Sequence, residues 1–115
     1  VRGVVVRLGA SFAKITIDGV RVRAGAAALD SQVARTAARA GVAGLEFYRG
    51  VPGTIGGALA MNAGAYEQET KDALVEAVAY DRSGARHVVK NAEMKFAYRH
   101  CGVGEGLIFT QALFK

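Results

Sequence analysis

Two short stretches of the chain alternate hydrophobic and polar residues with period two. Residues 14–17 and 20–23 flank the dipeptide Asp18-Gly19, and this pattern predicts two antiparallel strands joined by a tight turn. Asp-Gly tolerates the positive φ angles of a two-residue type I′ turn, so we place the corner of the hairpin there. The predicted buried face carries Ile15, Ile17, Val20 and Val22, and the opposite face carries Lys14, Thr16, Arg21 and Arg23.

The hydrophobic period changes to that of a helix near residue 30. Asp30 or Ser31 is suited to cap this helix at its N-terminus, and Gly41 is suited to end it in the left-handed conformation. A second, short helix is expected over residues 56–62, which are mostly small. The apolar residues at helical spacing in the first helix are Leu29, Val33, Ala37 and Ala40.

Runs of β-branched and other apolar residues predict four more strands, two of them joined by a turn at 81–84. One helical turn is expected at 91–94. Because the strands follow one another through hairpins and do not alternate with helices, the pattern predicts an α+β fold with a mainly antiparallel sheet and flanking helices. The four strands are expected at residues 4–8, 74–80, 86–89 and 107–114.

The composition is that of a single globular domain. The chain has 115 residues, of which 51% are hydrophobic and 22% are charged, and this balance is too apolar for a disordered segment. Its net charge of +5 favours anionic ligands, but the basic residues are scattered and lack the aromatic pattern of a nucleic-acid surface. No apolar run reaches the roughly 18 residues of a membrane span. We therefore expect a cytoplasmic protein that binds neither nucleic acid nor membrane.

Cysteine and histidine are too few for an internal disulfide or a zinc site. Cys101 is the only cysteine, and His87 and His100 are the only histidines. Their spacing matches no zinc motif, so we expect no bound metal. Cys101 is expected to be a passive small residue, because only the neighbouring His100 could activate its thiol.

Residues 50–64 concentrate glycine between two predicted elements. This segment holds five glycines and Pro52, the only proline of the chain. Such a loop can bring several backbone N–H groups close to an anion, and a helix that begins at Gly56-Gly57 would direct its positive end at a phosphate. The segment contains neither a dinucleotide-binding G-x-G-x-x-G after a strand nor a P-loop. From the residues alone, two interpretations of this segment are equally supported: a phosphate or cofactor site, and a set of tight turns.

Three motifs follow one another along the chain: Gly-Leu-Glu-Phe at 44–47, Gly-Val-Pro-Gly-Thr-Ile-Gly-Gly-Ala at 50–58 and Met-Asn-Ala-Gly-Ala-Tyr at 61–66. In sequence and order they resemble the flavin loop of one family, the UDP-N-acetylenolpyruvoylglucosamine reductases. The resemblance covers essentially the whole chain. It implies the second subdomain of an FAD-binding domain of the vanillyl-alcohol-oxidase/PCMH type. Further matches follow in the family's order at 71–72, 81–84 and 96–99.

The resemblance implies a flavin-dependent oxidoreductase. Such an enzyme takes hydride from NADPH onto FAD and passes it to the enolpyruvyl group of a UDP-sugar, which yields UDP-N-acetylmuramate for peptidoglycan. Arg99 matches the family's catalytic arginine, and Tyr98 beside it is implied in substrate binding. A guanidinium can hold the substrate carboxylate with two hydrogen bonds and stabilise the enolate-like charge. The implied FAD contacts are Pro52, Gly53, Thr54, Gly56, Gly57, Asn62, Gly64 and Ala65, with Gly25 and Ala26 as further candidates.

The same resemblance implies that parts of the active site lie outside this sequence. The family's first flavin loop would precede Val1, and its C-terminal substrate domain would follow Lys115. Residues 1–115 are therefore expected to be a partial FAD-binding domain whose partners are the missing domains of its own full-length chain. Alone, the chain is expected to be inactive and to bind FAD weakly or not at all. Alternative functions are another FAD-linked oxidoreductase of the same superfamily and a non-enzymatic anion-binding module.

Overall fold

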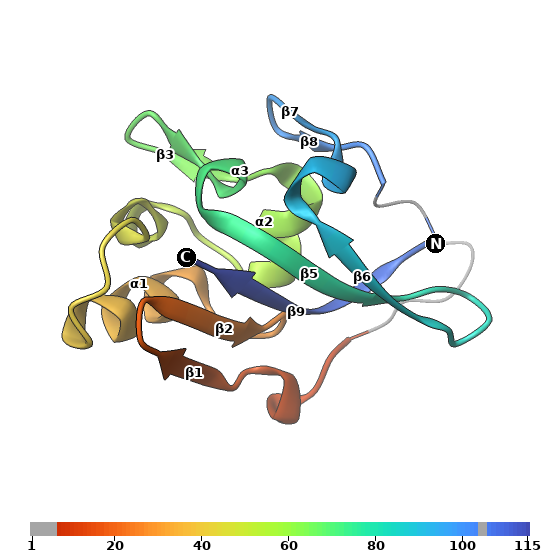
Figure 1. The fold of residues 1–115 in the computed structure, drawn as a ribbon, viewed down its shortest axis with the longest axis horizontal. Helices are drawn as coiled ribbons and strands as arrows, with labels where there is room; N and C mark the ends of the chain where they lie inside the picture. Colours follow the sequence, from red (N-terminus) through yellow and green to blue (C-terminus); the bar gives the residue numbers. More distant parts are fainter. Residues whose placement is uncertain (1–6, 104–105) are drawn as a thin grey trace.

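The computed structural model describes residues 7–103 and 106–115, and its centre is a five-stranded sheet (Figure 1). The strand order is β1-β2-β9-β5-β6, and every neighbouring pair is antiparallel. The predicted α+β fold with a mainly antiparallel sheet is thus confirmed. The strands of this sheet are β1 (Ile15–Asp18), β2 (Arg21–Gly25), β5 (Leu74–Tyr80), β6 (Arg86–Lys90) and β9 (Ile108–Phe114).

The strand predicted at residues 4–8 is not found in the two of its residues that the structure describes. Most of the strand expected at residues 4–8 lies outside the described residues, and Arg7 and Leu8 belong to no strand. The strands expected at 74–80, 86–89 and 107–114 are confirmed as β5, β6 and β9, with boundaries that differ by at most one residue.

The β1–β2 hairpin forms where the alternation predicts it, but its corner is shifted by one residue. Asp18 pairs with Arg21, so Gly19 and Val20 form the two-residue loop. Gly19 has a φ of +62°, but Val20 has no positive φ, which excludes the predicted type I′ turn because that turn needs positive φ at both positions. The prediction that Val20 joins the buried face is wrong, because Val20 is 61% exposed at this corner.

Helix α1 (Asp30–Arg39) ends as the sequence predicts. Gly41 has a φ of +75°, and its N–H donates to the carbonyl of Ala38 at 3.1 Å. The N–H of Val42 donates to the carbonyl of Ala37 at 2.9 Å. These two bonds form a Schellman motif, in which glycine adopts the left-handed conformation without the cost that a Cβ would add.

The start of α1 differs from the prediction. Leu29 occupies the N-cap position without a side-chain hydrogen bond, and Asp30 is the first helical residue. Leu29 is half exposed, whereas Val33 is fully buried and Ala37 nearly so. The helical spacing therefore identified the buried face correctly in the middle of the helix but not at its two caps, where Leu29 and Ala40 are exposed.

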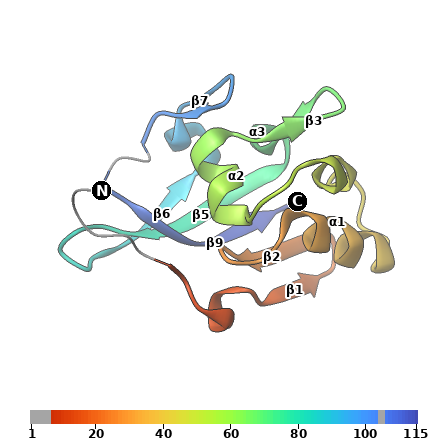
Figure 2. The same cartoon turned by 180° about the vertical axis from the view of Figure 1, so that it is seen from behind.

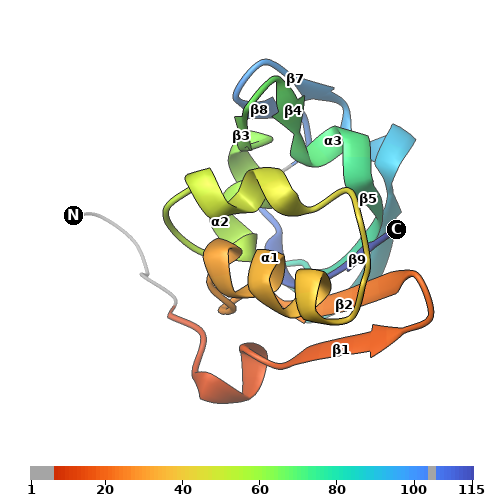
Figure 3. The same ribbon diagram turned by 90° about the vertical axis from the view of Figure 1, so that its left-hand side faces the viewer.

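Helix α2 (Ile55–Met61) confirms the short helix expected over 56–62. It ends at Asn62, whose φ of +46° is left-handed. Helices α1 and α2 lie on the same face of the sheet, as the view from behind and the side view show (Figures 2 and 3). Between them and the sheet lies a core that includes the ring of Tyr48, which packs edge-on against Phe114 with centroids 5.7 Å apart. Burial of such apolar area is the main stabilising contribution to the fold.

The β5–β6 turn is stabilised by one carboxylate. Asp81 Oδ1 accepts hydrogen bonds from the N–H and the hydroxyl of Ser83 and from the N–H of Ala85. His87 Nε2 lies 2.7 Å from Asp81 Oδ2. Hydrogen bonds from Ser83, His87 and Ala85 hold the pKa of Asp81 well below its usual range. The turn predicted at 81–84 is confirmed.

Two small hairpins and several short helical turns complete the fold. The hairpins lie on the side of the molecule away from β1, near each other in all three views (Figures 1, 2 and 3). Of the short helical turns, only the one at 91–94 was predicted. The hairpins are β3 (Gly64–Ala65) with β4 (Gln68–Glu69) and β7 (Phe96–Ala97) with β8 (His100–Cys101); the helical turns are η1 (Ala10–Phe12), η2 (Glu46–Gly50), α3 (Thr70–Ala73) and η3 (Asn91–Met94).

Candidate functional site

The glycine-rich loop before α2 lies against the loop that precedes α1. The N–H groups of Ile55 and Gly56 donate to the carbonyls of Ala28 and Ala26, both at 2.9 Å. These are the first two N–H groups of α2. They are bonded to protein carbonyls, so the expectation that the start of this helix directs its N–H groups at a phosphate is wrong for these two.

Glycine is required to different degrees at Gly53 in this loop and at Gly56 and Gly57 in the first turn of α2. Gly53 has a φ of +104°, a conformation that side chains rarely adopt. A Cβ on Gly56 would lie 3.3 Å from the Cβ of Ala26, so Gly56 lets α2 approach the neighbouring loop closely. A Cβ on Gly57 would meet only Thr54 Oγ1, at 4.0 Å. Among the described residues, neither packing nor backbone conformation therefore requires glycine at position 57.

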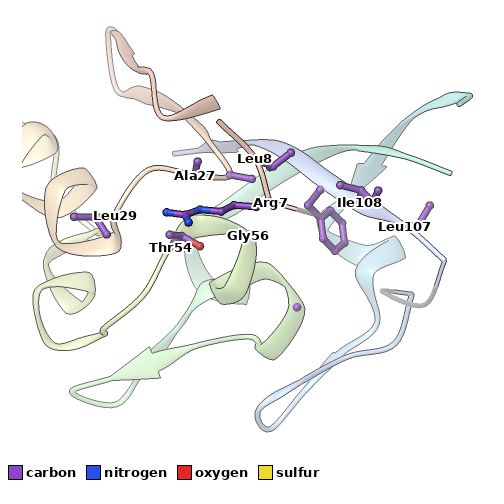
Figure 4. A pocket seen from close by; sticks show the side chains of 11 residues that line it. Arg7, Leu8, Ala27, Leu29, Thr54, Gly56, Leu107 and Ile108 are labelled. Carbon is purple, nitrogen blue, oxygen red and sulfur yellow. The ribbon is translucent and has the colours of Figure 1, made fainter. Parts of the chain in front are cut away.

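A cavity of about 640 Å³ lies where these two loops meet the start of β9 (Figure 4). Figure 4 shows the Arg7 side chain pointing toward Thr54, with Leu107 and Ile108 farther along the cavity. This volume lies within the range of about 300–1,000 Å³ that is typical of small-molecule sites. We call this space the loop cavity; its lining includes Arg7, Ala26, Thr54, Gly56, Ala60 and Ile108.

The lining of the loop cavity combines one cationic side chain with small and apolar ones. Arg7 is the one ionisable side chain among its described lining residues, and its guanidinium can pair with a phosphate. Thr54 adds a hydroxyl, and the small side chains of Ala26, Gly56 and Ala60 leave room beside the backbone. Sequence reasoning missed Arg7, because an arginine within a predicted strand carries no local signal of a ligand.

The predicted cofactor residues divide between two places. Thr54 and Gly56 line the loop cavity, together with Ala26. Pro52 and Gly53 lie exposed on the loop before α2, and Gly57 lies exposed in the first turn of α2, all outside that lining. Of the two further candidates, Gly25 lies against the backbone of Phe12, where a Cβ would collide with it, so its small size serves packing.

The predicted substrate residues lie at a second cavity, of about 430 Å³, beside the β3–β4 hairpin. We call it the hairpin cavity; Ala65, Tyr98 and Arg99 all line it. The Arg99 Cζ atom lies 4.8 Å from the centroid of the Tyr98 ring, and Tyr98 itself is 81% exposed. Arg99 Nη2 donates to the carbonyl of Gly64 at 3.3 Å, and Nη1 lies 3.8 Å from Glu69 Oε2. The guanidinium is thus held at the cavity wall by the hairpin.

Asn62 joins the two hairpins through its side chain. Its Nδ2 donates to the Ala97 carbonyl at 2.9 Å and to Glu69 Oε2 at 3.1 Å, and its Oδ1 accepts from the N–H of Lys71 at 2.9 Å. Asn62 is fully buried. Its amide is therefore part of the scaffold behind Arg99, and its contact with a cofactor stays a prediction.

Backbone strain concentrates around the hairpin cavity. Five non-glycine residues of the described chain have positive φ angles, between +46° and +66°. Such conformations cost free energy, on the order of 1–3 kcal/mol each, and tend to cluster at functional sites. All five belong to the two hairpins or their immediate flanks: Asn62, Tyr66, Glu67, Lys95 and Arg99.

A buried carboxyl lies at the start of α1. Asp30 is 1% exposed, and neither carboxyl oxygen has a hydrogen-bond partner within the described ranges. Desolvation raises the pKa of Asp30 to about 7. The nearby hydroxyl of Tyr48 bonds instead to Thr70 Oγ1 at 2.8 Å, and burial raises the pKa of Tyr48 above its usual value.

Three further observations on the described residues concern metal ligands, membrane helices and the single cysteine. Within residues 7–103 and 106–115, no group of three or more histidine, cysteine, aspartate or glutamate side chains is arranged to hold a metal ion. The helices in these ranges are all too short or too polar to cross a membrane. Cys101 is buried, and its thiol donates to the Met94 carbonyl at 3.4 Å, in agreement with a passive role.

Comparisons with known proteins identify a flavin-binding family. Residues 1–90 match the family model described as FAD binding domain. The UDP-N-acetylenolpyruvoylglucosamine reductase of Parvibaculum lavamentivorans is 64% identical over 115 residues, which are 100% of this chain and 37% of that protein. The protein of the same name from Rhodopseudomonas palustris strain BisB5 is 60% identical over 114 residues, 98% of this chain and again 37% of the relative.

A solved structure gives the same result for the fold. The crystal structure of UDP-N-acetylenolpyruvylglucosamine reductase from Thermus caldophilus matches with a TM-score of 0.83 at 38% sequence identity. The match covers 95% of this chain and 40% of that one. The chain thus spans little more than a third of the length of the relatives that it matches.

Proposed function

Because the chain belongs to the FAD binding domain family, we propose that it is the central flavin-binding portion of a UDP-N-acetylenolpyruvoylglucosamine reductase. The complete protein then reduces UDP-N-acetyl-3-enolpyruvoylglucosamine to UDP-N-acetylmuramate in the cytoplasm, with NADPH as the electron donor, for peptidoglycan synthesis. The observation that carries this proposal is Arg99, whose guanidinium lies with Tyr98 at the wall of a cavity beside the predicted flavin segment.

The residues of the loop cavity fit FAD. Arg7 offers a cation for the pyrophosphate, and Thr54 offers a hydroxyl beside it. The small residues of the loop let a large cofactor lie against the backbone, and Gly57 has an open surface at the start of α2. FAD, when bound, supplies the chemistry of accepting and donating hydride. The predicted contacts at Pro52, Gly53, Gly57, Asn62, Gly64 and Ala65 form part of this proposal.

Arg99 and Tyr98 act on the substrate in this proposal. The substrate carboxylate matches the planar fork of a guanidinium, and charge that develops next to that carboxylate during reduction is stabilised by the fixed cation. Tyr98 stacks near the guanidinium with most of its ring exposed, so one of its faces is available to the substrate. These roles need Arg99 to be held in place before the substrate binds, since a preorganised charge costs no rearrangement during the reaction.

The test uses the full-length protein that contains this sequence. Its flavin absorbance is followed as NADPH and then the enolpyruvyl UDP-sugar are added. We expect bleaching by NADPH and recovery of the colour with the sugar. Arg99→Ala is expected to retain the first step and to lose about 100-fold or more in the second, the range seen when one stabilising donor is removed.

The control for charge removal is Arg82→Ala, because Arg82 is an exposed arginine in the β5–β6 turn. It should behave as the wild type in both steps. A colourless protein that ignores both compounds would instead favour the anion-binding alternative. Colour that bleaches but never recovers with this sugar would favour another oxidoreductase of the same superfamily.

A further inference from the structure

The Arg99 guanidinium is held from one side by a single cross-strand pair. In the β3–β4 hairpin, Gly64 lies opposite Glu69. The Gly64 carbonyl accepts a hydrogen bond from Arg99 Nη2 at 3.3 Å, and Glu69 Oε2 lies 3.8 Å from Nη1. The two ends of the guanidinium fork therefore meet two residues that the sheet register places side by side.

The absence of a side chain at Gly64 makes this approach possible. A Cβ at that position would collide with the backbone carbonyl of Gln68 and would lie 2.9 Å from Glu69 Cγ and 3.0 Å from Arg99 Nη1. Glycine is therefore required first by the close approach of the two strands of the hairpin. The same lack of a side chain leaves room for the Glu69 carboxylate and the Arg99 guanidinium to lie beside each other.

Glu69 is itself fixed by several groups. Its Oε2 accepts from Asn62 Nδ2 at 3.1 Å, and its Oε1 lies 3.7 Å from Lys71 Nζ. Its backbone N–H donates to Asp72 Oδ2 at 2.8 Å at the start of α3. The Glu69 side chain is only 24% exposed, compared with 39% for that of Arg99. The carboxylate is therefore the better anchored member of this ion pair.

Arg99 needs such an anchor. Its φ of +51° is a strained conformation for a residue with a side chain, and it lies in the turn between β7 and β8. An arginine side chain has several rotatable bonds, so ordering it costs conformational entropy. A guanidinium carries five N–H groups, so contacts with Gly64 and Glu69 leave others for a ligand.

We propose that Glu69 is a positioning residue that holds the Arg99 guanidinium in the orientation in which it meets the substrate carboxylate. This inference rests on the proposed reductase function. Glu69 does not touch the substrate in this proposal and acts only through Arg99. Glu69 competes only weakly with the substrate carboxylate for the guanidinium. Its Oε2 lies 3.8 Å from Arg99 Nη1, and both side chains are partly solvated, so their attraction is weaker than that of a direct hydrogen-bonded ion pair.

The test is a double-mutant cycle in the full-length protein with Glu69→Gln and Arg99→Lys. Glutamine keeps an oxygen that can accept from Asn62 but removes the charge that attracts Arg99. We expect Glu69→Gln to lower kcat for reduction of the UDP-sugar roughly fivefold or more and to leave the rate of flavin reduction by NADPH unchanged. In the Arg99→Lys background the same substitution should have little further effect, because the fork that it positions is gone.

A second readout avoids turnover altogether. The affinity for UDP-N-acetylmuramate, measured by calorimetry on the oxidised protein, should fall with Glu69→Gln in the wild-type background but not in the Arg99→Lys background. Asp72→Asn is the matched control, because it removes a nearby negative charge, keeps an oxygen that can accept from the Glu69 N–H, and leaves the carboxylate near Arg99 in place. It should leave kcat and the affinity close to the wild-type values.

The outcomes separate this inference from the function on which it rests. Wild-type protein that does not react with the UDP-sugar overturns both proposals. Wild-type activity with an unaltered Glu69→Gln variant, or with equal losses in both backgrounds, overturns the positioning role alone. Tighter product binding in Glu69→Gln would also overturn it, since it would show that Glu69 competes with the ligand for Arg99.

Discussion

Gly57 and Gly53 lack side chains for different physical reasons, and substitution separates them. Alanine at 57 lies in a helix and meets only Thr54 Oγ1 at 4.0 Å, so Gly57→Ala should stabilise the fold by up to about 1 kcal/mol. In the proposed site the added methyl group reduces the space for FAD. We therefore expect a higher Tm together with weaker FAD binding, measured by thermal unfolding and by flavin fluorescence titration of the full-length protein.

Gly53→Ala is the comparison for that prediction. The φ of +104° at this position is strained for alanine, so the substitution should lower the free energy of unfolding by roughly 1–3 kcal/mol. A Gly57→Ala variant that is destabilised like Gly53→Ala would show that position 57 is required by the fold. Unchanged FAD affinity in a stabilised Gly57→Ala variant would exclude Gly57 from the cofactor site.

Asp30 predicts a pH dependence of stability. Its pKa in the folded state is raised to about 7 from an ordinary value of 3.8, so the folded protein binds one more proton than the unfolded chain between these pH values. The free energy of unfolding should therefore fall as the pH rises from about 4 to 7, by on the order of a few kcal/mol. The dipole of α1 favours the carboxylate by only about 0.3–1 kcal/mol and does not offset its burial.

Asp30→Asn tests this prediction because asparagine has a similar shape and no titratable proton. We expect the variant to be more stable than the wild type at pH 8 and to lose most of that advantage at pH 4.5. Denaturant unfolding curves at several pH values measure the difference, and other titrating groups cancel in the comparison. A constant difference across this range would mean that Asp30 is ionised in the folded protein at all of these pH values.

At the scale of elements, the junction of α2 with the two hairpins depends on one amide. Asn62→Gly keeps the left-handed conformation but removes three hydrogen bonds to Glu69, Ala97 and Lys71. Because these partners would lose bonds in a buried place, we expect a loss of roughly 2–4 kcal/mol in the free energy of unfolding. Amides of the β3–β4 and β7–β8 hairpins should also exchange faster with solvent, as hydrogen-exchange measurements can show.

Asn91→Gly gives a matched control for Asn62→Gly. The side chain of Asn91 also donates to two backbone carbonyls, those of Lys71 and Leu74, but at the start of η3 and closer to the surface. Asn91→Gly should therefore lower the free energy of unfolding by less than Asn62→Gly and should leave the hydrogen exchange of the hairpin amides unchanged. Equal protection of the hairpins in both variants would contradict the role of Asn62 as their common support.

The longer elements were predictable from the sequence because their periodicity extends over several residues. Strands β5 and β9 and helix α1 were located to within a residue or two in this way. The β1–β2 turn was misplaced because Asp-Gly is a general signal, whereas the actual register is set by pairing of the whole hairpin. Strands of two residues, such as β3 and β7, have no period to detect, and the Asn62 side chain links the two hairpins that they form.

Those residues of the candidate site that lie in short sequence motifs could be predicted, whereas those that only the fold brings together could not. Glycines 53, 56 and 57 mark the predicted flavin loop in the sequence, and the motif at 96–99 marks Arg99. Arg7 and Ile108 enter the loop cavity only because β9 and the segment before β1 fold next to α2. Glu69 meets Arg99 through a cross-strand pair with Gly64, which no local spacing reveals.

At the scale of the whole molecule, both cavities depend on segments that are distant in sequence. The loop cavity unites Arg7, the loops before α1 and α2, and the start of β9. The hairpin cavity unites the β3–β4 hairpin with the Tyr98-Arg99 turn. The sheet and the helices on its one face fix these segments relative to one another (Figures 2 and 3). Correct folding of the sheet is therefore a condition for both predicted binding events.

This dependence leads to a prediction for residues 1–115 expressed alone. The chain spans about 37% of its relatives, and tight ligand sites bury most of the ligand surface, so we expect this segment to supply only part of the FAD contacts. Its Kd for FAD should exceed that of the full-length protein by about 100-fold or more, equivalent to at least about 2.7 kcal/mol. Quenching of flavin fluorescence measures both values, and a cooperative thermal transition of the segment must first show that it is folded. A folded segment that binds FAD as tightly as the full-length protein would contradict the prediction and would place the whole cofactor site within residues 1–115.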